Sequence, residues 1–201
     1  GILGGESSLV YAYSLLHKLT RDPEYLRYAE RHFAVVERAV KNDQAYDLVY
    51  GNAGAILALV NLYSLQKDER YLACAKTAAK VICEAQREDG GWKSATASAP
   101  LAGFSHGSAG ITYALNRLYK LYPDKRIKQC IMKGVQYENR LYCEDDGNWK
   151  DIRKGATNGK SLCAWCHGAG GILLSRMSLL GTMDTTIDKV IKEDIHNAVR
   201  T

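Results

Sequence analysis

The sequence predicts an all-α protein built from inner and outer helical hairpins, as in an α/α toroid. Three observations predict this fold class. A Gly-x-x-Gly pair recurs at Gly1, Gly51, Gly107 and Gly168, an apolar segment follows each pair, and an amphipathic segment comes later in each unit. Segments that share one plan at intervals of 50, 56 and 61 residues indicate an array of supersecondary units.

The two segments of a unit differ in the side chains that they present around a helix. Residues 55–60 are apolar without interruption, which is typical of a helix covered on both sides. Residues 25–36 instead carry their apolar side chains on one stripe, at Tyr25, Ala29, Phe33 and Val36. We therefore expect the first helix of each unit in an inner layer and the second in an outer layer.

The repeat divides the chain into four units, approximately 1–50, 51–106, 107–167 and 168–201, within a single partial domain, 1–201. In each unit an aspartate marks the turn between the two helices: Asp22, Asp68, Asp124 and Asp184. Apart from one possible short hairpin, the loops show little strand character. Four hairpins close a ring poorly, so we expect an incomplete ring from a longer protein.

The composition is that of a globular protein and excludes several classes. With 201 residues, 46% of them hydrophobic, the chain can bury a core. It does not have the run of about 18 apolar residues that a membrane span needs, and its first residues lack the basic-then-apolar layout of a signal peptide. The net charge of +5 is spread without a basic block, so nucleic acid is not an expected partner. Six cysteines beside this much core indicate reduced thiols and a cytoplasmic location.

Reactive side chains lie just before three of the glycine pairs: Asp47, His106, and the neighbours Cys166 and His167. Glycine permits close backbone approach, so glycines at every inner entrance indicate that these helix ends crowd together. Crowded entrances form one opening, and a site is expected there. A carboxylate, an imidazole and a thiol would then converge from distant parts of the chain.

Each of these residues has a structural as well as a functional interpretation. Cys166 is either a zinc ligand or a buried structural thiol. With Cys163 it forms Cys-x-x-Cys, which also fits a redox pair or a two-thiolate metal clip. His106 is a general acid–base or a helix-capping residue, and Asp47 would equally well bind backbone N–H groups. Trp165, beside Cys166, is a packing residue or part of a substrate site.

Three segments together resemble the lanthionine synthetase C-like family: 46–54 (YDLVYGNAG), 105–111 (SHGSAGI) and 165–168 (WCHG). The resemblance covers essentially the whole chain through its repeat and is closest to the C-terminal cyclase domain of class II lanthipeptide synthetases. It implies a double-layered α/α barrel and a zinc-dependent cyclase. Such enzymes add a peptide cysteine thiol to dehydroalanine or dehydrobutyrine, which forms the thioether ring of a lantibiotic.

At the matching positions, the resemblance implies that Cys166 is the first zinc ligand, His106 the acid–base catalyst and Asp47 a supporting residue. His167 and Trp165 are then expected beside the substrate or behind the ligand, and no zinc role is given to His167. Zinc would lower the pKa of the substrate thiol, and the enolate formed by its addition would need a proton from a positioned acid. The implied partner is a precursor peptide, with a dehydratase domain in the full-length protein.

This chain departs from the family pattern in one respect. The family completes its zinc site with a later Cys-His-Gly motif, and none follows before Thr201. We therefore expect an incomplete Zn²⁺ site, and an inactive fragment unless a partner chain, Cys163 or His167 substitutes. One alternative is a non-catalytic scaffold that binds a peptide or partner. Another is an α/α-toroid enzyme that acts on a glycan with paired carboxylates. Against it, the expected opening carries His and Cys, whereas the acidic pairs Asp145-Asp146 and Glu88-Asp89 lie in loops.

Overall fold

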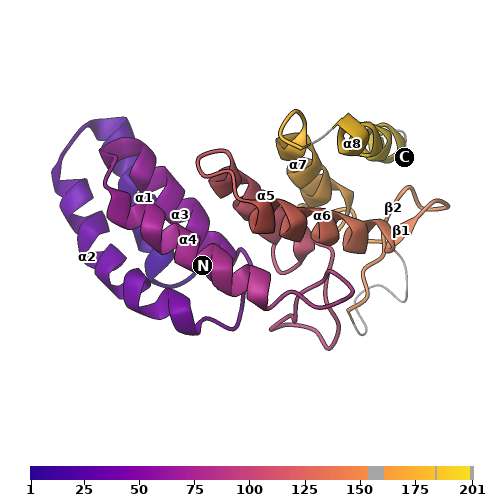
Figure 1. The fold of residues 1–201 in the computed structure, drawn as a ribbon, viewed down its shortest axis with the longest axis horizontal. Helices are drawn as coiled ribbons and strands as arrows, with labels where there is room; N and C mark the ends of the chain where they lie inside the picture. Colours follow the sequence, from indigo (N-terminus) through magenta and orange to yellow (C-terminus); the bar gives the residue numbers. More distant parts are fainter. Residues whose placement is uncertain (154–160, 184, 200–201) are drawn as a thin grey trace. The chain divides into compact units, whose positions relative to one another are not determined.

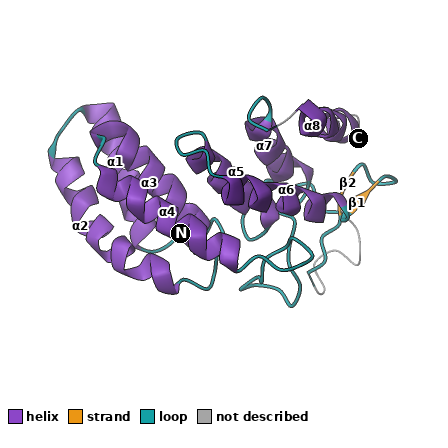
Figure 2. Cartoon of the chain, viewed as in Figure 1, coloured by secondary structure: helices purple, strands orange, loops and turns teal. Residues whose placement is uncertain are grey.

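The computed structural model describes residues 1–153, 161–183 and 185–199, which are mostly helical (Figures 1 and 2). The chain divides into two compact units, Gly1–Glu84 and Ala85–Thr201. The predicted all-α fold class is confirmed, whereas a single domain over 1–201 stays a prediction. Within the described ranges, each helix is too short or too polar to cross a lipid bilayer.

The first unit consists of two helical hairpins. Helix α1 (Glu6–Thr20) is followed by α2 (Glu24–Ala39) and the 3-10 helix η1 (Val40–Asn42), and α3 (Asn52–Gln66) is followed by α4 (Glu69–Glu84). Helix α1 packs against α2 and α3, and α3 packs against α4. The first helices of the two hairpins therefore lie side by side, as the repeat predicts (Figure 1).

Burial separates the two kinds of helix in this unit. Helix α3 buries side chains around most of its circumference, among them Ile56, Leu59 and Leu62. Helix α2 buries one stripe, at Ala29, Phe33 and Val36. An inner helix is covered by neighbours on several sides, whereas an outer helix keeps a solvated face. Both predicted periodicities are therefore confirmed in these helices.

The first unit departs from the predicted register at its start. In the other three units the first glycine of the pair is the N-cap of the inner helix. Helix α1 instead begins at Glu6, because the residues before it pair with the loop ahead of α3. The Ile2 amide donates to the Leu48 carbonyl at 2.9 Å, and the Gly1 ammonium donates to the Tyr50 carbonyl at 2.9 Å.

The second unit contains two further helical hairpins. Helices α5 (Ser108–Tyr119) and α6 (Lys125–Asn139) form one, and α7 (Ala169–Leu179) and α8 (Thr185–Val199) form the other. Helix α5 packs against α6 and α7, and α7 packs against α8. The arrangement of the first unit is thus repeated, with α5 and α7 as the inner pair.

A small β-hairpin lies between these helical hairpins and is the short hairpin that the sequence indicates. Strands β1 (Tyr142–Cys143) and β2 (Asn148–Trp149) are antiparallel, with Tyr142 opposite Trp149. Beyond β2, an isolated antiparallel bridge joins Lys150 to Ser161. Asn148 also holds the start of α7, because its Oδ1 accepts the Ala169 amide at 2.8 Å.

The predicted turn aspartates bind the first amides of the outer helices. The carboxylates of Asp22, Asp68 and Asp124 each accept the amide of the residue two positions ahead, at 2.8 to 2.9 Å. This satisfies N–H groups that have no partner within the helix. Asp184 lies outside the described residues.

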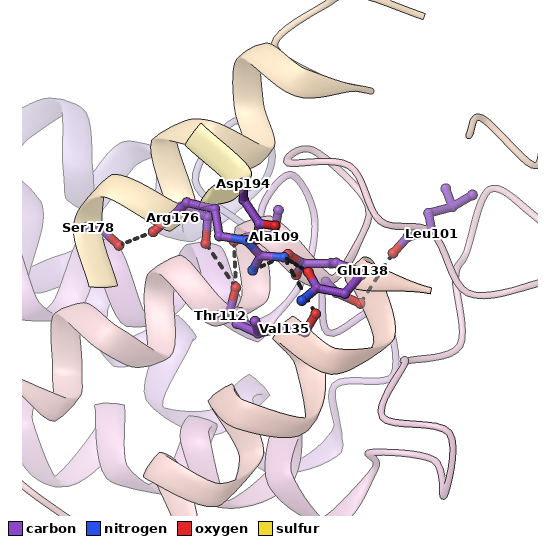
Figure 3. Close-up of polar contacts among 11 residues, drawn as sticks. Leu101, Ala109, Thr112, Val135, Glu138, Arg176, Ser178 and Asp194 are labelled. Atoms are coloured by element: carbon purple, nitrogen blue, oxygen red, sulfur yellow. Dashed lines mark hydrogen bonds and ion pairs between the residues drawn. The ribbon is translucent and has the colours of Figure 1, made fainter. Parts of the chain in front are cut away.

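A buried charge cluster joins α6, α7 and α8 (Figure 3). Arg176 is fully buried, with Nη1 2.7 Å from Glu138 Oε2 and Nε 3.0 Å from Asp194 Oδ2. Its Nη2 donates to Asn139 Oδ1 at 2.7 Å. Because burial disfavours charge, the pKa of Glu138 rises to about 7 although Arg176 opposes the rise, and burial also raises the pKa of Asp194. The cluster ties the last hairpin to the helix before it.

Candidate functional site

The entrances of α5 and α7 meet within the second unit. Ser105 donates from its backbone amide and its hydroxyl to the Cys166 carbonyl, at 3.3 and 3.2 Å. The rings of His106 and His167 lie 6.4 Å apart between their centroids, at an interplanar angle of 30°. The structure therefore brings His106 together with the Cys166–His167 pair.

This meeting requires a glycine at position 103. A Cβ at Gly103 would lie 2.4 Å from the Cys166 carbonyl oxygen and 3.0 Å from His167 Nδ1. Real Cβ atoms do not approach a backbone oxygen so closely, because the atoms overlap. Gly103 lies outside the Gly-x-x-Gly pairs, and the sequence analysis did not identify it.

The loop before α7 turns Cys166 and His167 toward the N-terminus of that helix. Gly168, the N-cap, has φ of 104°, a left-handed value that favours glycine. A Cβ there would also lie 1.7 Å from the Leu162 carbonyl oxygen. The Ala164 amide donates to the His167 carbonyl at 3.0 Å and closes the turn. Cys166 and His167 therefore directly precede the N-terminus of α7, the positive end of its dipole.

Burial and neighbouring charges set the protonation of His167. The residue is 7% exposed, and burial is the main cause that lowers its pKa. The positive charge of Arg153 lowers this pKa further, and the negative charge of Asp151 opposes it. The neutral imidazole is therefore favoured, the form in which one ring nitrogen can accept a hydrogen bond.

Asp151 and Arg153, which the sequence analysis missed, supply opposite charges beside this pair. Arg153 Nη2 lies 2.6 Å from Asp151 Oδ2, and its Nε lies 3.0 Å from Oδ1. The hydrogen bonds from Arg153 hold the pKa of Asp151 below its ordinary value. The pKa of Arg153 is raised mainly by Asp151 and in smaller part by Cys166. In the sequence, this ion pair is visible only as an Asp-x-Arg triplet after Trp149. Such a triplet is equally typical of a solvated loop.

The remaining candidates near Cys166 differ in exposure. Cys166 is half-buried and Cys163 is exposed, and neither forms a disulfide. Trp165 is 50% exposed, and its ring meets that of Phe104 edge-on with centroids 6.2 Å apart. Trp165 therefore packs against the loop before α5 and also presents an aromatic surface to solvent beside Cys166.

Asp47 belongs to the first unit and is 1% exposed. Its Oδ1 accepts the Tyr50 amide at 2.7 Å and the Gly51 amide at 3.2 Å, which holds the entrance of α3. This is the backbone-binding interpretation of the residue. Its assignment to the site of His106 and Cys166 stays a prediction.

The residues that the structure describes do not form a complete zinc site. Over the described parts of the chain, no group of three or more His, Cys, Asp or Glu side chains is placed to hold a metal ion. Catalytic zinc sites use about three protein ligands and an open position. Cys166 and its neighbours therefore do not provide the ligand set that the family's zinc would need.

Fold and site together define the class of this protein: repeated helical hairpins with imidazole and thiol groups at the entrances of inner helices. The family model of lanthionine synthetase C-like proteins matches residues 1–201, and the chain belongs to this family. The resemblance seen in the sequence is thus confirmed. No curated protein matches the chain in sequence.

Several solved structures share the fold. Nisin cyclase superposes with a TM-score of 0.75 at 18% identity, over 100% of this chain and 58% of its own. Cellobiose 2-epimerase from Bacillus thermoamylovorans has a TM-score of 0.69 at 11% identity, over 97% of this chain and 58% of its own. A polysaccharide lyase has a TM-score of 0.61 at 15% identity, over 100% and 60%. The chain thus spans less than two thirds of the length of these proteins.

Proposed function

We propose that this chain is part of a lanthipeptide cyclase, in which a cysteine thiol of a peptide adds to a dehydroalanine or dehydrobutyrine of the same peptide. The observation that carries the proposal is the meeting of His106 with the Cys166–His167 pair at two inner-helix entrances. Membership of the lanthionine synthetase C-like family and the fold shared with nisin cyclase support it.

The reaction adds S–H across a carbon–carbon double bond. His106 takes the proton of the substrate thiol, and the sulfur attacks Cβ of the dehydro residue to form the C–S bond. The π electron pair moves toward the adjacent carbonyl oxygen and gives an enolate. Protonated His106 then returns the proton to Cα, so that the imidazole is regenerated. A half-buried imidazole beside a second, uncharged one suits this alternation of base and acid.

When bound, Zn²⁺ would lower the pKa of the substrate thiol, and Cys166 is the residue of this chain that we propose as a ligand. Because the described residues supply no complete ligand set, no step here depends on the metal. His167 and Trp165 are proposed to line the substrate site.

The peptide partner and the setting follow from the same proposal. A dehydrated precursor peptide is the substrate, so a dehydratase domain must act before ring formation. The chemistry needs a free substrate thiol, and none of the six cysteines of this chain forms a disulfide. Both conditions suit the cytoplasm, where thiols stay reduced.

Two other functions are supported less well. A non-catalytic scaffold that binds a peptide would not need the complete ligand set that the described residues lack. A glycan-active enzyme would use paired carboxylates, but Asp145, Asp146, Glu88 and Asp89 are all exposed. Asp146 accepts the Ser161 hydroxyl, and Asp89 pairs with Arg87. These acidic pairs therefore belong to surface loops.

Replacement of His106 tests the proposal. His106→Ala in the natural protein that carries these residues should slow ring formation at least about 100-fold, the usual contribution of a general acid–base group. Free thiols left in a dehydrated peptide would be alkylated and counted by mass spectrometry. His196→Ala, which removes an exposed histidine of α8, is the control and should react normally. Undiminished ring formation by His106→Ala would contradict the acid–base assignment.

A further inference from the structure

The Asp-x-Arg triplet at the site has a near-identical counterpart elsewhere in the chain. In both, the arginine amide donates to its own aspartate, at 2.9 Å for Arg70 and 3.1 Å for Arg153. In both, the guanidinium edge also binds the aspartate, with Nη2 at 2.7 Å in the first pair and 2.6 Å in the second. The local geometry is therefore an intrinsic property of the triplet, and its surroundings must explain any difference in use.

The surroundings of the two pairs differ in burial. The Asp68 side chain is 32% exposed and that of Arg70 58% exposed, at the start of α4. The Asp151 side chain is 2% exposed and that of Arg153 30% exposed. Arg70 also binds Glu30, at 2.8 Å. One pair is thus a solvated helix start, whereas the other has a buried carboxylate that holds a partly exposed guanidinium.

The fold places this second pair beside the candidate site. Asn148 links β2 to the first amide of α7, and the Lys150–Ser161 bridge brings the chain after β2 alongside the segment before Cys166. Charge effects agree with this placement: Arg153 lowers the pKa of His167, and Cys166 raises the pKa of Arg153. Asp151 contacts Nε and Nη2 of Arg153, which leaves the Nη1 amino group outside the pair.

We propose that Arg153 is the oxyanion-binding residue of this site and that Asp151 is its positioning residue. The inference rests on the proposed function. When the substrate sulfur bonds to Cβ, the π electron pair of the dehydro residue moves to its carbonyl oxygen. The Arg153 guanidinium donates to that oxygen, and the charge is released when His106 protonates Cα. A fixed donor aimed at developing charge acts mainly on the transition state.

A structural role for the pair makes a different prediction from an oxyanion-binding role. If the pair merely fixes the loop, its loss should lower stability and weaken substrate binding. If Arg153 binds the enolate, Arg153→Gln should lower kcat at least about 100-fold, as loss of an oxyanion donor does, with KM within a few-fold of normal. Arg153→Lys should keep part of the activity, because the charge remains without the planar fork.

The experiment measures thioether formation on a dehydrated precursor peptide by the natural protein, with thermal unfolding of each variant recorded in parallel. Millimolar guanidinium should partly restore kcat to Arg153→Ala, but not to His106→Ala. Asp151→Asn should show an intermediate loss of kcat. Arg70→Gln is the matched control, because it breaks the same local geometry in the exposed pair, and it should keep kcat.

The outcomes separate this inference from the proposed function. Wild-type protein that forms no ring overturns both. Active wild type together with an Arg153→Gln variant of normal kcat overturns the assignment of Arg153 alone. The assignment of Arg153 is also overturned if the loss of activity appears in KM, parallels a fall in the melting temperature, or is not relieved by guanidinium. A loss of kcat with unchanged melting and guanidinium rescue supports the assignment.

Discussion

At the level of single residues, burial and neighbouring charges determine the protonation of His167. Burial and the positive charge of Arg153 lower its pKa below the ordinary 6.5. We therefore expect the His167 ring resonance to titrate below pH 6.5 by NMR, and Arg153→Gln to move that midpoint upward. Arg70→Gln, which changes an exposed ion pair of the other unit, is the control and should leave the His167 midpoint unchanged.

The sign of the linked stability change follows from that direction. The folded state binds the His167 proton less readily than the unfolded chain, so this contribution is present above pH 6.5 and is lost as the pH falls. His167→Asn should accordingly reduce the acid sensitivity of the second unit. A His167 midpoint at or above 6.5 would contradict the electrostatic account.

Site residues that directly precede a Gly-x-x-Gly pair could be predicted from the sequence, whereas site residues away from these pairs could not. His106 and Cys166 were identifiable because each lies directly before a glycine pair. Arg153 was not, because an ion pair becomes part of a site only through the β-hairpin that carries it there. Gly103 was missed for a similar reason, since its contact is with a segment far along the chain.

At the level of elements, the start of α7 depends on Gly168 far more than on Gly170. Gly168→Ala should destabilise the second unit by more than about 1 kcal/mol, because it strains a left-handed residue and meets the Leu162 carbonyl. Gly170→Ala is the matched control. A Cβ there has its nearest neighbours at 3.7 Å within a helix, so this change should be neutral or stabilising. Urea unfolding of the two variants gives the comparison, and equal stabilities would contradict it.

The Arg176 cluster predicts a pH dependence of the opposite sign to that of His167. The pKa of Glu138 is raised from 4.5 to about 7. The stability linked to its proton is therefore fully present below pH 4.5 and is lost as the pH rises through 7. Between pH 5 and 8, wild type should lose stability relative to Glu138→Gln by up to roughly 3 kcal/mol, the free energy that corresponds to this pKa change.

Chemical denaturation at several pH values checks this difference. The charges that face Glu138 are Arg176 and Asp194, so both stay in place in the variant. Glu88→Gln, in an exposed loop, is the control and should follow wild type at every pH. Parallel pH profiles for wild type and Glu138→Gln would show that the cluster holds no extra proton.

The helices could be predicted from the sequence, but the Arg176 cluster between them could not. The uninterrupted apolar run of α3 and the stripe of α2 follow from composition and periodicity alone. The start of α1 was misplaced because Ile2 pairs with Leu48, a contact that no local pattern encodes. Arg176 lies on a largely apolar helix and would be assigned to solvent, yet carboxylates from two other helices surround it.

At the level of the whole molecule, the described residues do not supply a complete set of zinc ligands. Unit 85–201 contains Cys166 beside two histidines, but the described chain has no group of three metal-binding side chains. Binding of zinc at catalytic sites is strong because about three ligands act together, and loss of ligands weakens it steeply. We therefore expect the 201-residue chain by itself to retain less than one zinc per molecule after dialysis.

Metal analysis and competition with a chromophoric chelator measure this directly. Cys166→Ala should remove the zinc that remains, whereas Cys143→Ala, which deletes a thiol of the β-hairpin in the same unit, should leave it unchanged. A longer form of the protein that binds one zinc tightly would locate the other ligands outside these residues, and Cys166→Ala should then abolish binding in that form too. Tight, stoichiometric zinc in the 201-residue chain would contradict the expectation, because the described side chains could not account for it.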